Sequence, residues 1–241
     1  MKVVAILPAA GLGTRMGRSS AETSGVSRKQ FMLLDGSPIL LHTLRKFLAC
    51  SLVNEVVVAL RQEDIGWFSE LLQREAPVKA VRLVVGGNSR QQSVENALEA
   101  LAPDTELVAV HDAVRPFIDM DTLEKVIQEA AQTGAAIVGI VPVDTVKQVK
   151  GNKIHATLPR ERLILAQTPQ VFRYRLLREA FARARQDGFT GTDESSLVER
   201  LEQVEVSVVP GSDRNIKITK PSDMELARLF LNEEVARRRS C

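Results

Sequence analysis

The 241-residue chain has only two cysteines, Cys50 and Cys241, and few aromatic residues. Two cysteines make no disulfide framework, so we expect both thiols to stay free in a reducing compartment such as the cytoplasm. Because aromatic residues make up only 4% of the chain, there is little stacking surface for single-stranded nucleic acid. No His/Cys spacing suits zinc, which argues against a structural metal site.

The sequence also lacks a strong charge bias and any long apolar run. Its 32 Lys+Arg residues nearly balance 30 Asp+Glu, so the formal charge of +2 gives no reason to expect a nucleic-acid partner. No run approaches the roughly 18 apolar residues that a membrane span needs, so no membrane association is expected. The apolar start at residues 3–7 is short for a signal peptide, and a buried first strand explains it better.

Short apolar runs rich in Val and Ile alternate with amphipathic segments along the chain. The runs span Val3–Leu7, Glu55–Leu60, Val81–Val85, Leu107–His111, Ala136–Val141 and Val204–Val209. This alternation predicts an α/β fold, with a mostly parallel sheet covered by helices on both faces. Helices are predicted to begin after Ser37–Pro38 and at Asp119, and one helix to end at Gly134. We expect a single domain over residues 1–241.

Residues 142–166 follow a different pattern, with apolar residues at Val143, Val146, Val149 and Ile154 around a Gly151–Asn152 turn. The pattern predicts a β-hairpin arm that projects from the main sheet. Its apolar positions need a cover, which is either the arm's own domain or a second copy of the chain.

The most informative stretch directly follows the first predicted strand, where residues 8–17 read PAAGLGTRMG. Small residues let backbone N–H groups approach a polyphosphate, and Arg15 adds a fork that can hold two phosphate oxygens. The glycine spacing fits neither the dinucleotide fingerprint nor the Walker loop. A polyphosphate cradle is therefore the preferred interpretation, and a glycine turn without a ligand is the alternative. Residues 17–27, made largely of Gly, Ser, Thr and Ala, are expected to be mobile without ligand.

Several further motifs follow in order along nearly the whole chain. They are KQF at 29–31, Gly86-Gly87 with Arg90 and Ser93, HDAVRPF at 111–117, TPQ at 168–170, TDES at 192–195 and NIKIT at 215–219. Together with the loop at 8–17, this set resembles the 2-C-methyl-D-erythritol 4-phosphate cytidylyltransferase family of the non-mevalonate isoprenoid pathway. Arg28 stands where members of that family usually have proline, and the spacer between Arg15 and Lys29 is several residues longer.

The resemblance implies a Rossmann-like fold and a homodimer formed through the arm. It implies a Mg²⁺-dependent enzyme that joins CTP to 2-C-methyl-D-erythritol 4-phosphate, giving 4-diphosphocytidyl-2-C-methyl-D-erythritol and pyrophosphate by in-line attack of the substrate phosphate on the α-phosphorus. The Mg²⁺ ion would be held mainly by the CTP phosphates, with Asp112 as the one candidate protein ligand.

The resemblance also assigns roles to individual residues. Cations for the transition state come from Arg15, Lys29 and Lys217. The nucleotide would be bound by Pro8, Ala9, Ala10, Gly11, Gly13, Gly87, Asn88, Ser93 and Asp112. The polyol phosphate would be bound by Asp112, Arg115, Thr145, Arg160, Thr192, Lys217 and Thr219, with Arg160 and Thr145 reaching across from the arm of a second copy.

Two other functions stay open at this point. The first is a related cytidylyltransferase that acts on ribitol or ribulose 5-phosphate; Pro8-Ala9-Ala10 and the TDES stretch favour the erythritol substrate. The second is a non-catalytic nucleotide-binding module, which the joint presence of Arg15, Lys29, Asp112 and Lys217 disfavours. Asp112 as a helix cap and Arg160 as a solvated arm residue are the simpler alternatives for those two positions.

Overall fold

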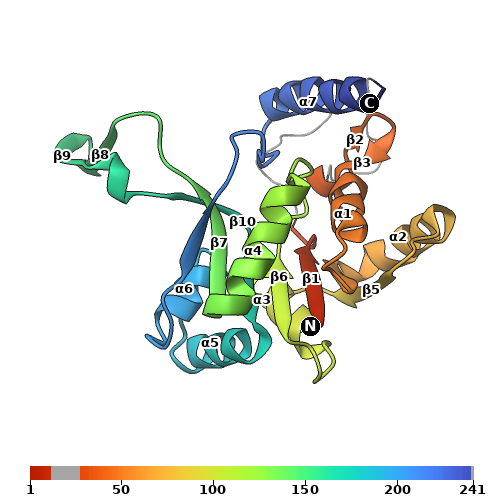
Figure 1. Ribbon diagram of the computed structural model, residues 1–241, viewed down its shortest axis with the longest axis horizontal. Helices are drawn as coiled ribbons and strands as arrows, with labels where there is room; N and C mark the ends of the chain where they lie inside the picture. The colour runs from red at the N-terminus through yellow and green to blue at the C-terminus, as the bar shows by residue number, and fades with distance from the viewer. Residues whose placement is uncertain (12–27, 240–241) are drawn as a thin grey trace.

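A computed structural model describes residues 1–11 and 28–239, so the predictions made for Gly13, Arg15, Cys241 and the segment 17–27 lie outside the described residues. Seven strands form the central sheet (Figure 1). In spatial order they are β11 (Ser207–Pro210), β7 (Ala135–Ile140), β10 (Leu165–Arg173), β6 (Leu107–Val110), β1 (Val3–Pro8), β4 (Glu55–Leu60) and β5 (Ala80–Val85). Only β10 runs antiparallel to its two neighbours, which confirms the predicted α/β class and mostly parallel sheet.

Helices cover both faces of this sheet. One face carries α1 (Ile39–Ala49), α2 (Gln62–Glu75) and α4 (Met120–Thr133), and the other carries α3 (Arg90–Glu99), α5 (Tyr174–Gln186) and α6 (Glu194–Glu199). A smaller apolar cluster joins α7 (Pro221–Arg239) to the hairpin of β2 (Leu33–Leu34) and β3 (Ser37–Pro38). No helix in the described part of the chain is long and apolar enough to cross a membrane.

The first strand shows why both faces of the sheet are apolar. Side chains alternate along a strand, so Val3, Ala5 and Leu7 enter one core cluster while Val4 and Ile6 enter the other. A continuous apolar run is the pattern required of a strand that is buried on both sides.

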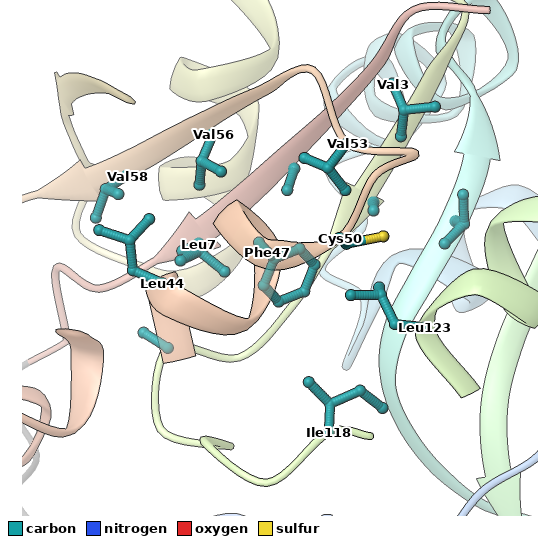
Figure 2. Close-up of a cluster of buried hydrophobic side chains, with 14 of the residues drawn as sticks. Val3, Leu7, Leu44, Phe47, Cys50, Val53, Val56, Val58, Ile118 and Leu123 are labelled. Atoms are coloured by element: carbon teal, nitrogen blue, oxygen red, sulfur yellow. The ribbon is translucent and has the colours of Figure 1, made fainter. Parts of the chain in front are cut away.

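Figure 2 shows the core beneath α1, where the Phe47 ring lies among aliphatic side chains from several elements. Phe47 is fully buried, so its replacement by alanine would cost about 3–5 kcal/mol of stability. Cys50 is a buried free thiol in the same cluster.

The predicted helix boundaries are confirmed. Helix α1 begins directly after Pro38, and the Asp119 carboxylate caps α4 by accepting a hydrogen bond of 2.8 Å from the Thr122 N–H. Helix α4 ends at Gly134, whose φ of 99° lies in the left-handed region that glycine adopts without strain.

The predicted arm is a two-stranded hairpin, β8 (Val146–Lys150) and β9 (Lys153–Leu158), separate from the central sheet (Figure 1). A short 3₁₀ helix, η3 (Arg160–Arg162), leads back from it. At the boundary predicted for the arm, Leu165 and Ala166 already pair with Ile140 and Gly139 of β7, so the chain has rejoined the central sheet there.

Two details of the strand prediction were wrong. Strand β10 was not predicted, because its proline and its irregular pairing with β7 interrupt the pattern of a buried strand. The run Val204–Val209 begins as a loop, since pairing with β7 starts only at Ser207, opposite Ala136.

Candidate active site

The order of the strands places a cleft where the sheet changes direction. From β1 the chain moves outward to β4 and β5, and then returns to β6 on the other side of β1. Ligands of open α/β sheets bind at the carboxyl ends of the strands at such a point. A cleft of about 660 Å³ lies there, lined by the ends of β1, β4, β5 and β6.

The cleft brings most of the predicted residues together. Those that line it are Pro8, Ala9, Ala10, Gly11, Lys29, Gly87, Asn88, Ser93, Asp112 and Lys217. Its walls also hold residues that were not predicted as site residues, namely Gln30, Arg61, Gln62, Glu63, Gly86, Ser89, Arg90, Ala113 and Val114. Gln30 is almost fully buried, and its amide donates hydrogen bonds to the carbonyl oxygens of Ala9 (2.7 Å) and Gly11 (3.1 Å).

The turn after β5 needs two glycines because other chain segments approach it closely. A Cβ atom on Gly86 would lie 2.5 Å from the Ala10 Cβ, far inside van der Waals contact. A Cβ on Gly87 would overlap the Gln92 side chain. Glycine at position 86 lets the turn pack against the small-residue loop after β1, and glycine at position 87 leaves room for the Gln92 side chain of α3.

The backbone N–H groups of this turn have partners on helix α3. The Gly87 N–H donates to Ser93 Oγ at 3.1 Å, and the Asn88 N–H donates to Gln92 Oε1 at 2.8 Å. Recognition of a ligand by these two N–H groups therefore requires that the Ser93 and Gln92 side chains release them.

Asp112, directly after β6, is the electrostatic centre of the cleft. Its Oδ1 is 3.1 Å from Arg90, and its Oδ2 is 2.8 Å from Lys217 and 3.3 Å from Arg115. Burial alone would raise the pKa of Asp112, but the neighbouring charges, led by Arg90 and Lys217, hold it well below its usual range. The carboxylate is therefore ionised at all physiological pH values.

Arg90 connects Asp112 to a second buried carboxylate. Its guanidinium donates two hydrogen bonds to Glu194, of 2.7 and 2.9 Å, and a third to Asp112. Burial raises the pKa of Glu194 despite this pairing. Burial alone would lower the pKa of Arg90, but the charges of Glu194 and Asp112 outweigh burial and raise it. This ion pair joins the start of α3 to the start of α6.

Lys217 is positioned by the fixed backbone around it. Asn215 donates to the carbonyl oxygen of Thr168 (2.9 Å) and accepts at its own carbonyl from Arg115 (2.6 Å). The Ile218 N–H donates to the Val114 carbonyl at 3.0 Å. The lysine thus lies between two anchored residues.

His111 belongs to the support of the site and not to its surface. Its Nε2 lies 3.0 Å from the Arg115 carbonyl oxygen, which can only accept, so Nε2 carries the hydrogen. The Thr168 hydroxyl donates to Nδ1 at 3.1 Å and accepts a hydrogen bond from the Asp112 N–H. Burial lowers the pKa of His111 to about 4, so the ring is neutral.

Of the predicted site residues that the structure describes, five lie outside the walls of the cleft. Arg115 is directed at Asp112 and Asn215, and Thr219 donates to Asp223 at the start of α7. Thr192 lines a separate small cavity of about 20 Å³ beside Glu194. Thr145 and Arg160 lie at the arm, where Arg160 donates to the Val143 carbonyl.

The switch-point cleft, the small-residue turn, the lysines and the buried aspartate together are consistent with an α/β nucleotidyltransferase. The sequence model of the 2-C-methyl-D-erythritol 4-phosphate cytidylyltransferase family matches residues 3–233. The chain belongs to this family.

Individual relatives agree. The chain is 68% identical to a 2-C-methyl-D-erythritol 4-phosphate cytidylyltransferase of Solibacter usitatus (strain Ellin6076), with 98% of each chain covered. It is 49% identical to one of Acidobacterium capsulatum, with 98% of this chain and 100% of that protein covered. Among solved structures, 4-diphosphocytidyl-2C-methyl-D-erythritol synthase from Anaerococcus prevotii DSM 20548 is similar at a TM-score of 0.83 and 29% identity, covering 96% of this chain and 98% of that chain.

Proposed function

We propose that the cleft joins CTP to 2-C-methyl-D-erythritol 4-phosphate, releasing pyrophosphate. The observation that carries this conclusion is that Lys29 and Lys217 line the same cleft as the small-residue turn, in a chain matched by that family over residues 3–233. A phosphate oxygen of the polyol phosphate attacks the α-phosphorus of CTP in line with the leaving pyrophosphate. The nucleophile is already an anion, so the reaction needs no general base, in keeping with a neutral His111 that is hydrogen-bonded away from the cleft.

Catalysis then rests on positioning and on positive charge at the five-coordinate phosphorus. Lys29 and Lys217, with Arg15, supply that charge. Asp112 pairs with Lys217 and Arg90, which line the cleft, and with Arg115, which lies outside its walls. Glu194 also pairs with Arg90, so the cluster contains two carboxylates and three cations. Its net charge is positive, which suits the phosphate group of the polyol substrate.

The nucleotide base would lie against the turns after β1 and β5. We propose that backbone groups of Ala9, Ala10, Gly87 and Asn88 select cytosine, with Ser93 beside them. The turns after β1 and β5 approach each other closely at Gly86, so we expect a base that lies against them to be selected by size, against the larger purines.

Mg²⁺ would enter as the complex with CTP. No group of three or more His, Cys, Asp or Glu residues that could hold a metal occurs in the described ranges, and Asp112 is already engaged by three cations. The residues thus suit an ion held by triphosphate oxygens, where it would offset charge on the leaving pyrophosphate. Removal of divalent ions by EDTA is expected to stop the reaction, and added Mg²⁺ to restore it.

The arm would complete the site from a second copy. Its side chains Val143, Val149 and Ile154 are 76%, 62% and 67% exposed, and a two-stranded hairpin is marginally stable alone in water. We propose that the partner subunit covers this hairpin, and that Arg160 and Thr145 approach the partner's polyol phosphate. Arg115, Thr192 and Thr219 would support the same subsite. The low cysteine content is consistent with a cytoplasmic enzyme.

The decisive assay measures pyrophosphate release with CTP and Mg²⁺ on 2-C-methyl-D-erythritol 4-phosphate and, in parallel, on ribitol 5-phosphate. ATP, GTP and UTP serve as nucleotide controls. Release with CTP and the erythritol phosphate alone is the expected result. A preference for ribitol phosphate would reassign the substrate, and binding of CTP without pyrophosphate release from either polyol would indicate a binding module.

A further inference from the structure

The short 3₁₀ helix η2 (Lys29–Phe31) carries a cleft lysine, and the residue before it is tied to a distant helix. The Arg28 guanidinium forms an ion pair of 2.9 Å with Glu63 and a second ion pair with Asp64. Both carboxylates lie in the first turn of α2, more than thirty residues further along the chain. Arg28 therefore joins the entrance of η2 to the helix that follows β4.

The partner Asp64 shows that this contact is more than a surface ion pair. Asp64 is 9% exposed, and its Oδ2 atom has no hydrogen-bond partner among the described residues. A buried carboxylate is costly unless a cation pairs with it. Arg28 supplies that cation, with a side chain only 18% exposed.

The other two residues of η2 are anchored independently. Gln30 donates to the carbonyl oxygens of Ala9 and Gly11 in the small-residue turn. The Phe31 ring packs edge-on against Trp67 of α2, with centroids 4.9 Å apart. Lys29 therefore lies between an ionic anchor on one side and polar and aromatic anchors on the other.

We propose that Arg28 is a positioning residue for Lys29: its ion pairs with Asp64 and Glu63 fix the backbone from which Lys29 enters the cleft. The inference rests on the proposed function, because it assigns Lys29 to the CTP phosphates. A lysine side chain has many rotamers, so its charge is effective at a phosphate only if its backbone is already in place. Arg28 supplies this order without itself lining the cleft.

The test separates positioning from simple charge neutralisation. Arg28→Met removes the ion pairs but leaves the buried Asp64 carboxylate without its Arg28 partner. The double variant Arg28→Met/Asp64→Asn, which also removes that charge, is therefore made alongside it. If Arg28 positions Lys29, both variants lose about tenfold in kcat/KM for CTP, while the double variant recovers the melting temperature. Arg28→Lys is expected to recover most of the activity.

A matched control is Arg45→Met, which removes an exposed ion pair of 2.8 Å between α1 and Glu75 at the far end of α2. This variant should keep wild-type kinetics. Trp67 is the single tryptophan of the chain, so its emission reports directly on the contact with Phe31. We expect the emission to shift in Arg28→Met and in the double variant, but not in Arg45→Met.

Wild-type activity in Arg28→Met, or full activity in the double variant, would overturn the inference. CTP affinity is measured by calorimetry on the same proteins, so the question is decided even without turnover. If the wild-type chain binds CTP but releases no pyrophosphate, the proposed function fails, whereas a tenfold weaker affinity in both Arg28 variants still supports positioning. Equal affinities in all variants would reject it.

Discussion

The Nζ of Lys217 lies 2.8 Å from Oδ2 of Asp112, so a cleft lysine and a buried carboxylate at the end of a central strand form one ion pair. The two side chains are differently exposed, at 34% for Lys217 and 8% for Asp112. Loss of one partner should therefore have different consequences from loss of the other.

Lys217→Met is expected to lower kcat about 10²-fold, because it removes a cation from the phosphate-binding edge. Its effect on the free energy of unfolding should stay within about 1 kcal/mol, since a partly exposed lysine contributes little to stability. Steady-state pyrophosphate release and denaturant unfolding measure the two quantities. A free energy of unfolding that falls by clearly more than about 1 kcal/mol, with kcat close to the wild-type value, would count against a catalytic role for Lys217.

Asp112→Asn is expected to lower both activity and stability. The substitution leaves Arg90, Arg115 and Lys217 gathered around a neutral amide, and breaking a buried ionic cluster costs about 3–5 kcal/mol. Denaturant unfolding of Asp112→Asn beside Lys217→Met checks the contrast. Equal stabilities of the two variants would show that the three cations do not depend on Asp112.

The lowered pKa of the buried His111 predicts that the free energy of unfolding depends on pH. Burial lowers its pKa from 6.5 to about 4, so below pH 6.5 the unfolded chain takes up a proton that the folded chain refuses. The contribution of His111 is present above pH 6.5 and is lost as the pH falls toward 4, by up to about 3 kcal/mol. His111→Gln, which has no titratable ring, should show a flatter profile.

Because other groups titrate in the same range, the informative quantity is the difference in unfolding free energy between wild type and His111→Gln. This difference should shrink as the pH is lowered from 6.5 to 4. A constant difference over that range would mean that His111 is not held neutral by the fold.

Much of the fold was predictable because strands buried on both faces leave continuous apolar runs, as the Val3–Leu7 run did for β1. Strand β10 escaped prediction because its pairing to β7 is irregular and depends on contacts distant in sequence. The cap at Asp119 was predictable because it acts within one helical turn.

The same distinction applies to the cleft. The residues of the turn after β1 were predictable from a local motif, whereas the Arg90–Glu194 pair joins residues 104 positions apart. Charge patterning along one segment cannot reveal such a partner. For Gln30, the available signal was its place between a cleft lysine and an aromatic residue, which did not specify its contacts with Ala9 and Gly11.

Gly86→Ala should damage the cleft, because the new methyl group would lie 2.5 Å from the Ala10 Cβ. The turn after β1 must then move, and we expect weaker CTP binding together with a stability loss of about 1–3 kcal/mol. Gly66→Ala is the matched control, since its methyl group meets nothing within 4 Å and it lies inside α2. That variant should gain about 0.5–1 kcal/mol from helix propensity, with unchanged CTP affinity measured by calorimetry.

The arm allows a test of dimerisation and catalysis together. Ile154→Asp places a charge on an exposed apolar position of β9, so it should shift the chain toward monomer in sedimentation velocity if a second copy covers the hairpin.

Arg160→Ala should leave the assembly intact but raise KM for the polyol phosphate more than KM for CTP, because, of the two substrates, the guanidinium would contact only the polyol phosphate. A monomeric Ile154→Asp variant should show the same selective loss, since it cannot present Arg160 to a partner. Equal losses for both substrates in Arg160→Ala would argue against its placement across the interface, and full activity in a monomeric variant would argue that each chain carries a complete site.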